Sequence, residues 1–221
     1  MAASATSRTS KPRTPKGRAK VVHERLATMY PEALCELDHA NAFQLLIATI
    51  LSAQCTDARV NLVTPAVFAR YPEPADLAAA KPEGLSELIK PTGFFNVKTK
   101  SLLGMASALV ERYDSTVPGP MEDLTSLPGV GRKTANVVRS VALGLPGLPV
   151  DTHVGRLARR LGLTTEEDPV KVEMELNAMV PAAERGEFSL RLILHGRRVC
   201  FARKPACAVC GLADICPSAG R

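Results

Sequence analysis

Residues 127–138 read LPGVGRKTANVV, and this stretch indicates how the surrounding chain folds. A short helical pattern, MEDLTSL, ends where the stretch starts, and a longer amphipathic pattern, RKTANVVRSVAL, begins inside it. Gly129 and Gly131 lie between the two patterns, and glycine permits the positive φ angles that a tight turn requires. The stretch therefore predicts two helices joined by a glycine-containing corner.

The same corner is a candidate phosphate site. The first N–H groups of a helix have no partner within the helix, and the helix dipole favours an anion beside them. Glycine also lets a phosphate come close to the backbone. Many helical corners contain glycine and bind nothing, so this pattern alone leaves both interpretations open. The residues that we assign to DNA binding in the corner are Gly129, Val130, Gly131, Arg132 and Thr134.

Lys133 lies in the first turn of the second helix. The positive end of the helix dipole disfavours an ammonium ion, and partial burial, which we expect at this position, does so too. Both effects favour a neutral amine, which attacks carbon centres and forms Schiff bases. The alternative is a solvated lysine beside a phosphate.

A second charged centre is Asp151, in the sequence PVDTH at 149–153. It precedes a helical pattern, where a carboxylate is a good N-cap. The alternative is an ionised carboxylate that stabilises a developing cation or assists proton transfer. For His153 we expect a packed or hydrogen-bonded side chain, with a role as ligand or base as the alternative.

Four of the six cysteines lie close together at the end of the sequence, with the spacing C-x6-C-x2-C-x5-C. In a reducing cytosol such crowding favours a metal site over disulfides. Four thiolates at this spacing can surround a zinc ion or a cubane iron–sulfur cluster, and the spacing leaves both open. Arg203 and Lys204 lie in the first loop, where we expect phosphate contacts, with two solvated charges as the alternative. The four cysteines are Cys200, Cys207, Cys210 and Cys216.

The rest of the sequence predicts an all-α protein. Apolar residues make up 46% of the chain and aromatic residues only 4%, with no Trp. Ala, Leu and Val therefore form the core, which favours helices over sheets. Helical periodicity recurs from about residue 19 onward, and we find no sustained alternating pattern and no internal repeat. Asn41 is expected to cap a buried helix, AFQLLIATILSAQ.

The basic charge is concentrated at the start of the chain. Residues 1–20 carry six Lys or Arg and no acid, whereas the remaining 201 residues hold 22 basic and 22 acidic groups. A disordered extension and a tether that binds nucleic acid are both consistent with this composition. The segment lacks the apolar core of a secretion signal, although an organellar transit peptide would share its Ser and Arg. We expect a cytosolic protein and no membrane span.

Three features occur in one order along the chain: LPGVGRKTANVV, then VDTH, then ILHGRRVC with the spaced cysteines. In this combination the chain closely resembles the endonuclease III family of DNA glycosylases. The segments FQLLIATILSAQCTD at 43–57 and TGFFNVKTKSL at 92–102 share the resemblance, which spans about residues 21–217.

The resemblance implies a helix-hairpin-helix fold of two lobes. A six-helix barrel that contains the hairpin would span 35–145. The other lobe would combine 21–34 with 146–221 and carry a [4Fe–4S] cluster, while 1–20 would form a disordered basic tail. Double-stranded DNA with damaged pyrimidines or abasic sites would lie in the cleft between the lobes.

The resemblance also implies an activity in base excision repair. The family removes oxidised pyrimidines as a glycosylase and then cleaves the abasic site as a lyase, through a Schiff base and β-elimination. The family's lysine and aspartate correspond to Lys133 and Asp151. Gln54 matches the residue that fills the gap left by a flipped base, with a cap at the end of a buried helix as the alternative. The four cysteines would bind the cluster, and His195 would be a buried structural histidine behind it.

Three other functions are possible for such a sequence. An adenine-mismatch glycosylase of the same superfamily usually lacks a lysine at the position of Lys133 and carries a further C-terminal domain. A non-catalytic DNA-binding module would not need both Lys133 and Asp151. A helical adaptor stabilised by zinc would be colourless. We expect the enzyme, acting as a monomer in the cytoplasm and associated with the nucleoid.

Overall fold

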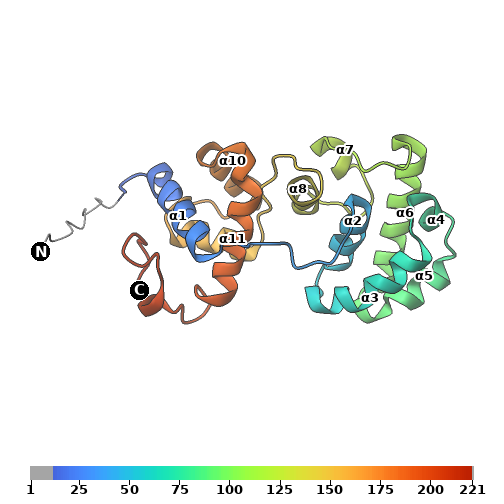
Figure 1. Cartoon of the computed structure of the whole chain (residues 1–221), viewed down its shortest axis with the longest axis horizontal. Coiled ribbons are helices and arrows are strands. Elements are labelled where there is room, and N and C mark those ends of the chain that lie inside the picture. The colour runs from blue at the N-terminus through green and yellow to red at the C-terminus, as the bar shows by residue number, and fades with distance from the viewer. Residues whose placement is uncertain (1–11, 221) are drawn as a thin grey trace, which may run out of the picture. The chain divides into compact units, whose positions relative to one another are not determined.

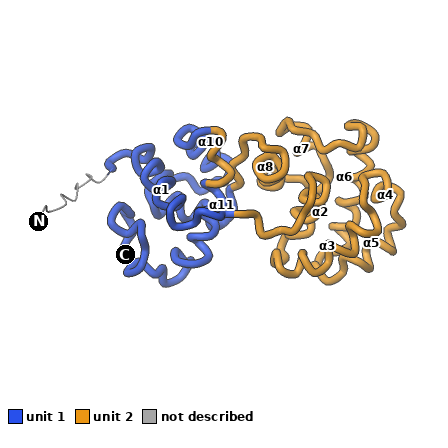
Figure 2. The backbone as a smooth tube through the Cα atoms, in the orientation of Figure 1, with its two compact units in different colours: residues 1–33, 150–181, 188–221 blue, residues 34–149, 182–187 orange. Residues whose placement is uncertain are grey.

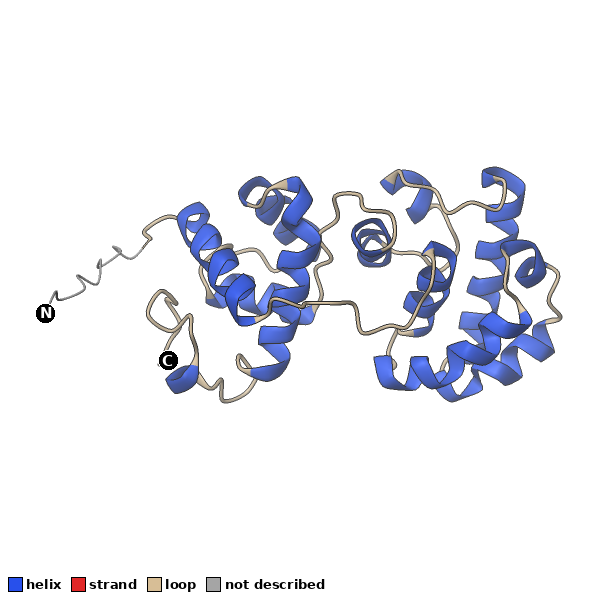
Figure 3. Cartoon of the chain, in the orientation of Figure 1, coloured by secondary structure: helices blue, strands red, loops and turns tan. Residues whose placement is uncertain are grey.

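A computed structural model describes residues 12–220 of the chain. These residues form eleven α-helices, three short 3-10 helices and no strand, which confirms the all-α prediction (Figures 1 and 3). The chain divides into two compact units (Figure 2). Unit 1 combines residues 1–33, 150–181 and 188–221, and unit 2 combines 34–149 with 182–187.

Unit 2 is built around α2 (Ala42–Leu51), of which eight residues are buried. A helix that is apolar on every side has to be surrounded, and α2 packs against α3, α6 and α8. Asn41 caps it as predicted, because its side chain accepts from the Gln44 N–H at 2.9 Å. The other helices of unit 2 are α3 (Asp57–Arg70), α4 (Pro74–Ala78), α5 (Pro82–Ile89), η1 (Lys90–Thr92), α6 (Phe95–Tyr113), α7 (Met121–Thr125), α8 (Arg132–Val141) and η2 (Ala182–Glu184).

The predicted corner joins α7 to α8 and packs against α6. A Cβ added at Gly129 would lie 2.6 Å from the Cβ of Ser101, and one added at Gly104 would lie 3.1 Å from the Pro128 ring. Ser101 and Gly104 are small residues one turn apart on α6, so they let the corner approach the helix closely. Gly129 also has a φ of +79°, which an L-residue adopts only at a cost.

Gly131 lies in a different conformation from Gly129. It is the N-cap of α8 with φ −89° and ψ 172°, an ordinary extended conformation. A Cβ added there would meet no described atom within 4 Å. Of the two glycines that permit a positive φ, only Gly129 therefore adopts one, and the chain reverses there.

Helix α8 is fastened to the proline-rich segment that follows it. The side-chain oxygen of buried Asn136 accepts from the Leu148 N–H at 3.1 Å, and Arg139 Nε donates to the Pro146 carbonyl at 3.0 Å. Gly147 approaches α8 so closely that an added Cβ would lie 2.4 Å from the Asn136 carbonyl oxygen. These contacts fix the path of the chain up to residue 149.

The units differ from the predicted lobes at residue 34, at 146–149 and at 182–187, all of which belong to unit 2. Residues 182–187 belong to unit 2, although the prediction placed 146–221 entirely in the other lobe. The cause is a close contact at Gly186, where an added Cβ would lie 2.7 Å from the Ser140 Cβ of α8.

Unit 1 contains α1 (Pro15–Met29), α9 (Thr152–Arg160), α10 (Pro169–Met179), η3 (Cys207–Val209) and most of α11 (Arg185–Arg198). Its largest buried side chains are Phe188 and Leu26. None of the helices in residues 12–220 has the length and apolarity needed to cross a membrane.

Part of the predicted disordered tail is helical. Thr14 caps α1 by accepting from the Gly17 N–H at 3.1 Å, and Pro15 occupies the first turn, where its missing N–H costs nothing. Arg18 donates to the Gly162 carbonyl, and Ala19 is buried. The expectation of disorder is therefore wrong for residues 15–20, and residues 1–11 lie outside the described part of the chain.

The structure of the corner predicts unequal effects of substituting its two glycines. We expect Gly129→Ala to lower the free energy of unfolding by at least about 2 kcal/mol, because it adds both a left-handed residue and an overlap with Ser101. Gly131→Ala should change it by no more than about 1 kcal/mol, since it removes neither a contact nor a positive φ. Urea denaturation measures both, and equal losses would contradict this account of the corner.

Candidate active site and metal centre

Lys133 projects from the first turn of α8 and its side chain is exposed. The partial burial of Lys133 expected from the sequence is therefore wrong, because the turn lies at the surface, with Gly131 and Arg132 exposed as well. Arg132 is exposed beside it and Thr134 is half-buried. Gly131 has no side chain to cap the helix, so the positive end of α8 is open to an anion.

Val130 does not fit the predicted DNA contact. Its side chain is buried in the core of unit 2, and its N–H donates to the Leu127 carbonyl at 3.1 Å. The side chain of Val130 and its backbone N–H are thus both used in contacts within the protein. Val130 anchors the corner, and the amides of the first turn of α8 are the groups that face outward.

Asp151 is the N-cap of α9 in unit 1. Its Oδ1 accepts from the Val154 N–H at 2.8 Å, and within residues 12–220 its Oδ2 makes no hydrogen bond. The cap that the sequence suggested is therefore present, and one carboxylate oxygen is still available for another partner. Lys133 and Asp151 lie in different units of the chain.

His153 is packed, as expected, and its partner is an arginine that the sequence analysis missed. One terminal nitrogen of Arg156 lies 3.1 Å from His153 Nδ1, and it donates to the Gly196 and Cys200 carbonyls, both at 3.0 Å. Gly196 makes room for this contact, since an added Cβ would lie 2.9 Å from His153 Nδ1. The helix that Asp151 caps is thereby tied to the first cysteine.

The four cysteines line one cavity of about 170 Å³ in unit 1. The cavity is several times the ~30 Å³ that a water molecule occupies in the liquid. Its other walls are mainly apolar and include Leu157, Leu161 and Leu212. This space fits a cubane cluster better than one zinc ion.

The chemistry of the thiols also fits a cationic group in the cavity. Burial raises the pKa of the Cys210 and Cys216 thiols, and the other cysteines of the group raise it further. Thiolates gathered this closely repel one another unless positively charged iron lies between them. Arg160 adds a second positive charge, since it lies 3.4 Å from the Cys200 sulfur and donates to the Phe201 carbonyl at 2.7 Å.

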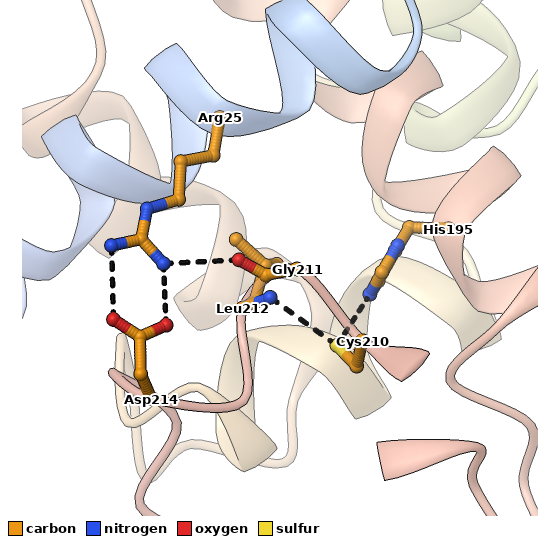
Figure 4. A network of polar contacts seen from close by, with 6 residues as sticks. All are labelled: Arg25, His195, Cys210, Gly211, Leu212 and Asp214. Carbon is orange, nitrogen blue, oxygen red and sulfur yellow. Dashed lines mark hydrogen bonds and ion pairs between the residues drawn. The ribbon is translucent and has the colours of Figure 1, made fainter. Parts of the chain in front are cut away.

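A network of polar contacts holds the far end of the cysteine loop (Figure 4). His195 Nε2 and the Leu212 N–H each lie 3.4 Å from the Cys210 sulfur. Arg25 of α1 pairs with both carboxylate oxygens of Asp214, at 2.5 and 3.0 Å, and donates to the Gly211 carbonyl at 3.0 Å. The loop is thereby braced against α1.

His195 is buried behind the cysteines, as predicted. Its Nδ1 lies 3.0 Å from the Tyr30 hydroxyl, and burial lowers its pKa. A neutral ring that accepts from Tyr30 at Nδ1 carries its proton on Nε2, where it donates to Cys210.

The remaining predicted residues are exposed. Gln54 follows α2 with a left-handed φ of +52°. The C-cap of α2 is Ser52, so the structure does not give Gln54 the alternative role of a helix cap. Arg203 and Lys204 lie exposed on the loop between the first two cysteines.

Comparison with known proteins places these features in a family. Residues 47–182 match a family model described as HhH-GPD superfamily base excision DNA repair protein, and residues 200–216 match the iron-sulfur binding domain of endonuclease III. The chain is 52% identical to an endonuclease III of Synechocystis sp., over 92% of this chain and 94% of that protein.

Two solved structures have the same fold, each with a TM-score of 0.87 over 92% of this chain and 96% of theirs. One is a non-covalent endonuclease III–DNA complex, 40% identical in sequence. The other is a trapped endonuclease III–DNA covalent intermediate, described as an estranged-adenine complex, and is 41% identical. These similarities agree with the cavity in assigning a [4Fe–4S] cluster to the chain.

The metal centre predicts a specific effect of losing one thiolate. We expect Cys207→Ser to lose most of the iron, the sulfide and the brown colour, and to lower the melting temperature, because ligation contributes to folding. Cys55→Ser, in unit 2, is the control and should keep its iron. Iron analysis and visible absorption measure the outcome, and a protein that binds zinc in place of iron would contradict the assignment.

Proposed function

The chain belongs to the endonuclease III family, and on that premise we propose that Lys133 is the amine that attacks the damaged nucleotide. The protein is a DNA glycosylase and AP lyase of base excision repair. The observation that carries the proposal is the placement of an exposed lysine on the first turn of α8, beside an N-terminus that no described side chain caps. A relative 41% identical to this chain has been trapped in a covalent intermediate with DNA, which supports an attacking side chain in the family.

DNA binding would begin at the phosphates. The open amides of α8 accept one phosphate, with Gly131 leaving room for its approach. Arg132, Arg203 and Lys204 add positive charge that does not depend on base sequence. The target nucleotide then leaves the stack, and Gln54 fills the gap.

The substrates would be duplexes with oxidised pyrimidines or abasic sites. A pyrimidine that has lost its aromaticity stacks poorly on its neighbours, so its extrusion costs less than that of a normal base. An abasic site has no base to extrude. Both substrates then present C1′ of the sugar to the lysine.

The chemistry would proceed in two stages. The neutral Lys133 amine attacks C1′, the bond from C1′ to the base breaks, and the base leaves with the bonding electron pair. Loss of a proton from nitrogen and opening of the sugar ring give a Schiff base. This acidifies the C2′ proton, whose removal expels the 3′ phosphate by β-elimination.

Asp151 would stabilise the first transition state. Its Oδ1 is held by the Val154 N–H, which orients the carboxylate, while Oδ2 is available to the cationic sugar or to the proton that leaves the amine.

The cysteine loop supports binding of DNA. Cys200, Cys207, Cys210 and Cys216 would hold the cluster, with Arg160 and His195 contacting the ligand sulfurs. When bound, the cluster supplies four metal–thiolate cross-links that stiffen the loop carrying Arg203 and Lys204. The basic residues of 1–20 would add to DNA affinity, and the enzyme would act in the cytoplasm at the nucleoid.

Replacing the amine tests the nucleophile. We expect Lys133→Gln to bind a duplex with an abasic site but to give no covalent product with borohydride, because no Schiff base forms. Lys100→Gln, an exposed lysine of α6, should be trapped like the parent protein. Trapping that persists in Lys133→Gln would assign the attack to another group.

Asp151→Asn tests the charge without removing the helix cap. An asparagine oxygen still accepts from the Val154 N–H, so the melting temperature should stay within about 2 °C. Loss of the negative charge should slow single-turnover base removal by about 100-fold. Asp168→Asn makes the same change at the N-cap of α10 and should leave the rate unchanged. A normal rate in Asp151→Asn would reduce the residue to a cap.

A further inference from the structure

Lys98 of α6 is a buried lysine that the proposed chemistry does not use. Only 5% of its surface is exposed. Its Nζ donates to the Leu51 carbonyl at 2.8 Å and to the Thr92 carbonyl at 2.9 Å. Burying an amine is unfavourable unless such bonds replace its contacts with water, so the two carbonyls account for its position.

These two carbonyls lie at the starts of two different loops. Leu51 ends α2, three residues before Gln54, and Thr92 ends η1, two residues before Phe94. Carbonyls at the end of a helix carry partial negative charge, which favours a cationic partner. One side chain therefore connects the loop at 52–55 with the loop at 92–94 from the inside of unit 2.

Both loops contain a residue in an unfavourable conformation. The φ angles of Gln54 and Phe94 are +52° and +48°, in the left-handed region that non-glycine residues seldom occupy. The side chains of both residues are exposed, so their own burial does not hold them there. Such conformations persist only where the surroundings impose them, and Lys98 supplies a fixed contact beneath each loop.

We propose that Lys98 is a positioning residue, which holds the 52–55 loop to the 92–94 loop and keeps Gln54 ready to enter the gap of a flipped nucleotide. The role of Gln54 rests on the proposed function, whereas the link between the loops rests on the contacts of Lys98 alone. Burial lowers the pKa of Lys98, with nearby Cys55 opposing the effect. Because the amine keeps N–H donors in either protonation state, the link does not depend on its charge.

Hydrogen exchange tests the link without DNA. The N–H groups of Cys55 and Gly93 donate to the Ser52 and Lys90 carbonyls at 3.1 and 3.2 Å, so they report on the two loops. Lys98→Met keeps the length of the side chain and removes its donors. We expect exchange at both amides to become about tenfold faster, the equivalent of one lost hydrogen bond. Lys100→Met changes an exposed lysine on the same helix and should leave exchange unchanged. Equal exchange in the two variants would overturn the proposal.

A double-mutant cycle tests the effect on Gln54. The probe is a duplex with a tetrahydrofuran abasic analogue opposite 2-aminopurine, which fluoresces more when a side chain displaces it from the stack. Lys100→Met should give the full signal, whereas Gln54→Ala and Lys98→Met should each lose most of it. The double variant should lose no more than either single variant, because both changes remove the same event. Additive losses, or a full signal in Lys98→Met, would overturn the positioning role.

The two measurements separate this inference from the proposed function. A full fluorescence signal in Gln54→Ala would overturn the gap-filling role of Gln54, and with it the claim that Lys98 positions Gln54. Hydrogen exchange would still decide whether Lys98 joins the two loops. If Lys98→Met does not fold, Lys98→Gln replaces it, because its shorter amide keeps donors in the same space but does not span both carbonyls. The criteria for exchange and fluorescence stay the same.

Discussion

The close approach of the hairpin corner to α6 is the constraint on which the position of Lys133 depends. Gly129 lies so near Ser101 that even a methyl group at its Cα would overlap, and its left-handed conformation reverses the chain at that point. Val130 then fills the core, and Gly131 starts α8. These fixed residues set the point at which α8 begins, and Lys133 lies exposed in its first turn.

Unit 2 also shows how polar groups buried in an apolar core find hydrogen-bond partners. Helix α2 is buried almost completely, so the carbonyl at its end cannot reach water, and the Lys98 amine replaces water there. On α8, the side-chain oxygen of Asn136 likewise replaces water as the partner of the Leu148 N–H. In both places one buried polar side chain joins two segments, and one of these leads to a residue of the proposed site, Gln54 after α2 and Asp151 after Leu148.

Unit 1 is organised around the cysteine loop. Arg156 and Arg160 reach it from α9, His195 from α11 and Arg25 from α1. Three helices thus contact the loop whose four thiolates would repel one another without iron. Through Arg156 and Arg160, the helix that Asp151 caps is therefore joined to the loop that carries Arg203.

The sequence by itself determined the helices, the family and the residues with reactive groups. Apolar periodicity and caps such as Asn41 and Asp151 are local signals, and the cysteine spacing limits the metal centre before any folding is considered. The tertiary structure decided what depends on neighbours distant in sequence. Only packing against Ser101 separates the role of Gly129 from that of Gly131, and only the Leu127 carbonyl and the core remove Val130 from the DNA contacts. The links made by Lys98 and Arg156 left no signal in the sequence, because a backbone carbonyl accepts a hydrogen bond whatever its side chain is.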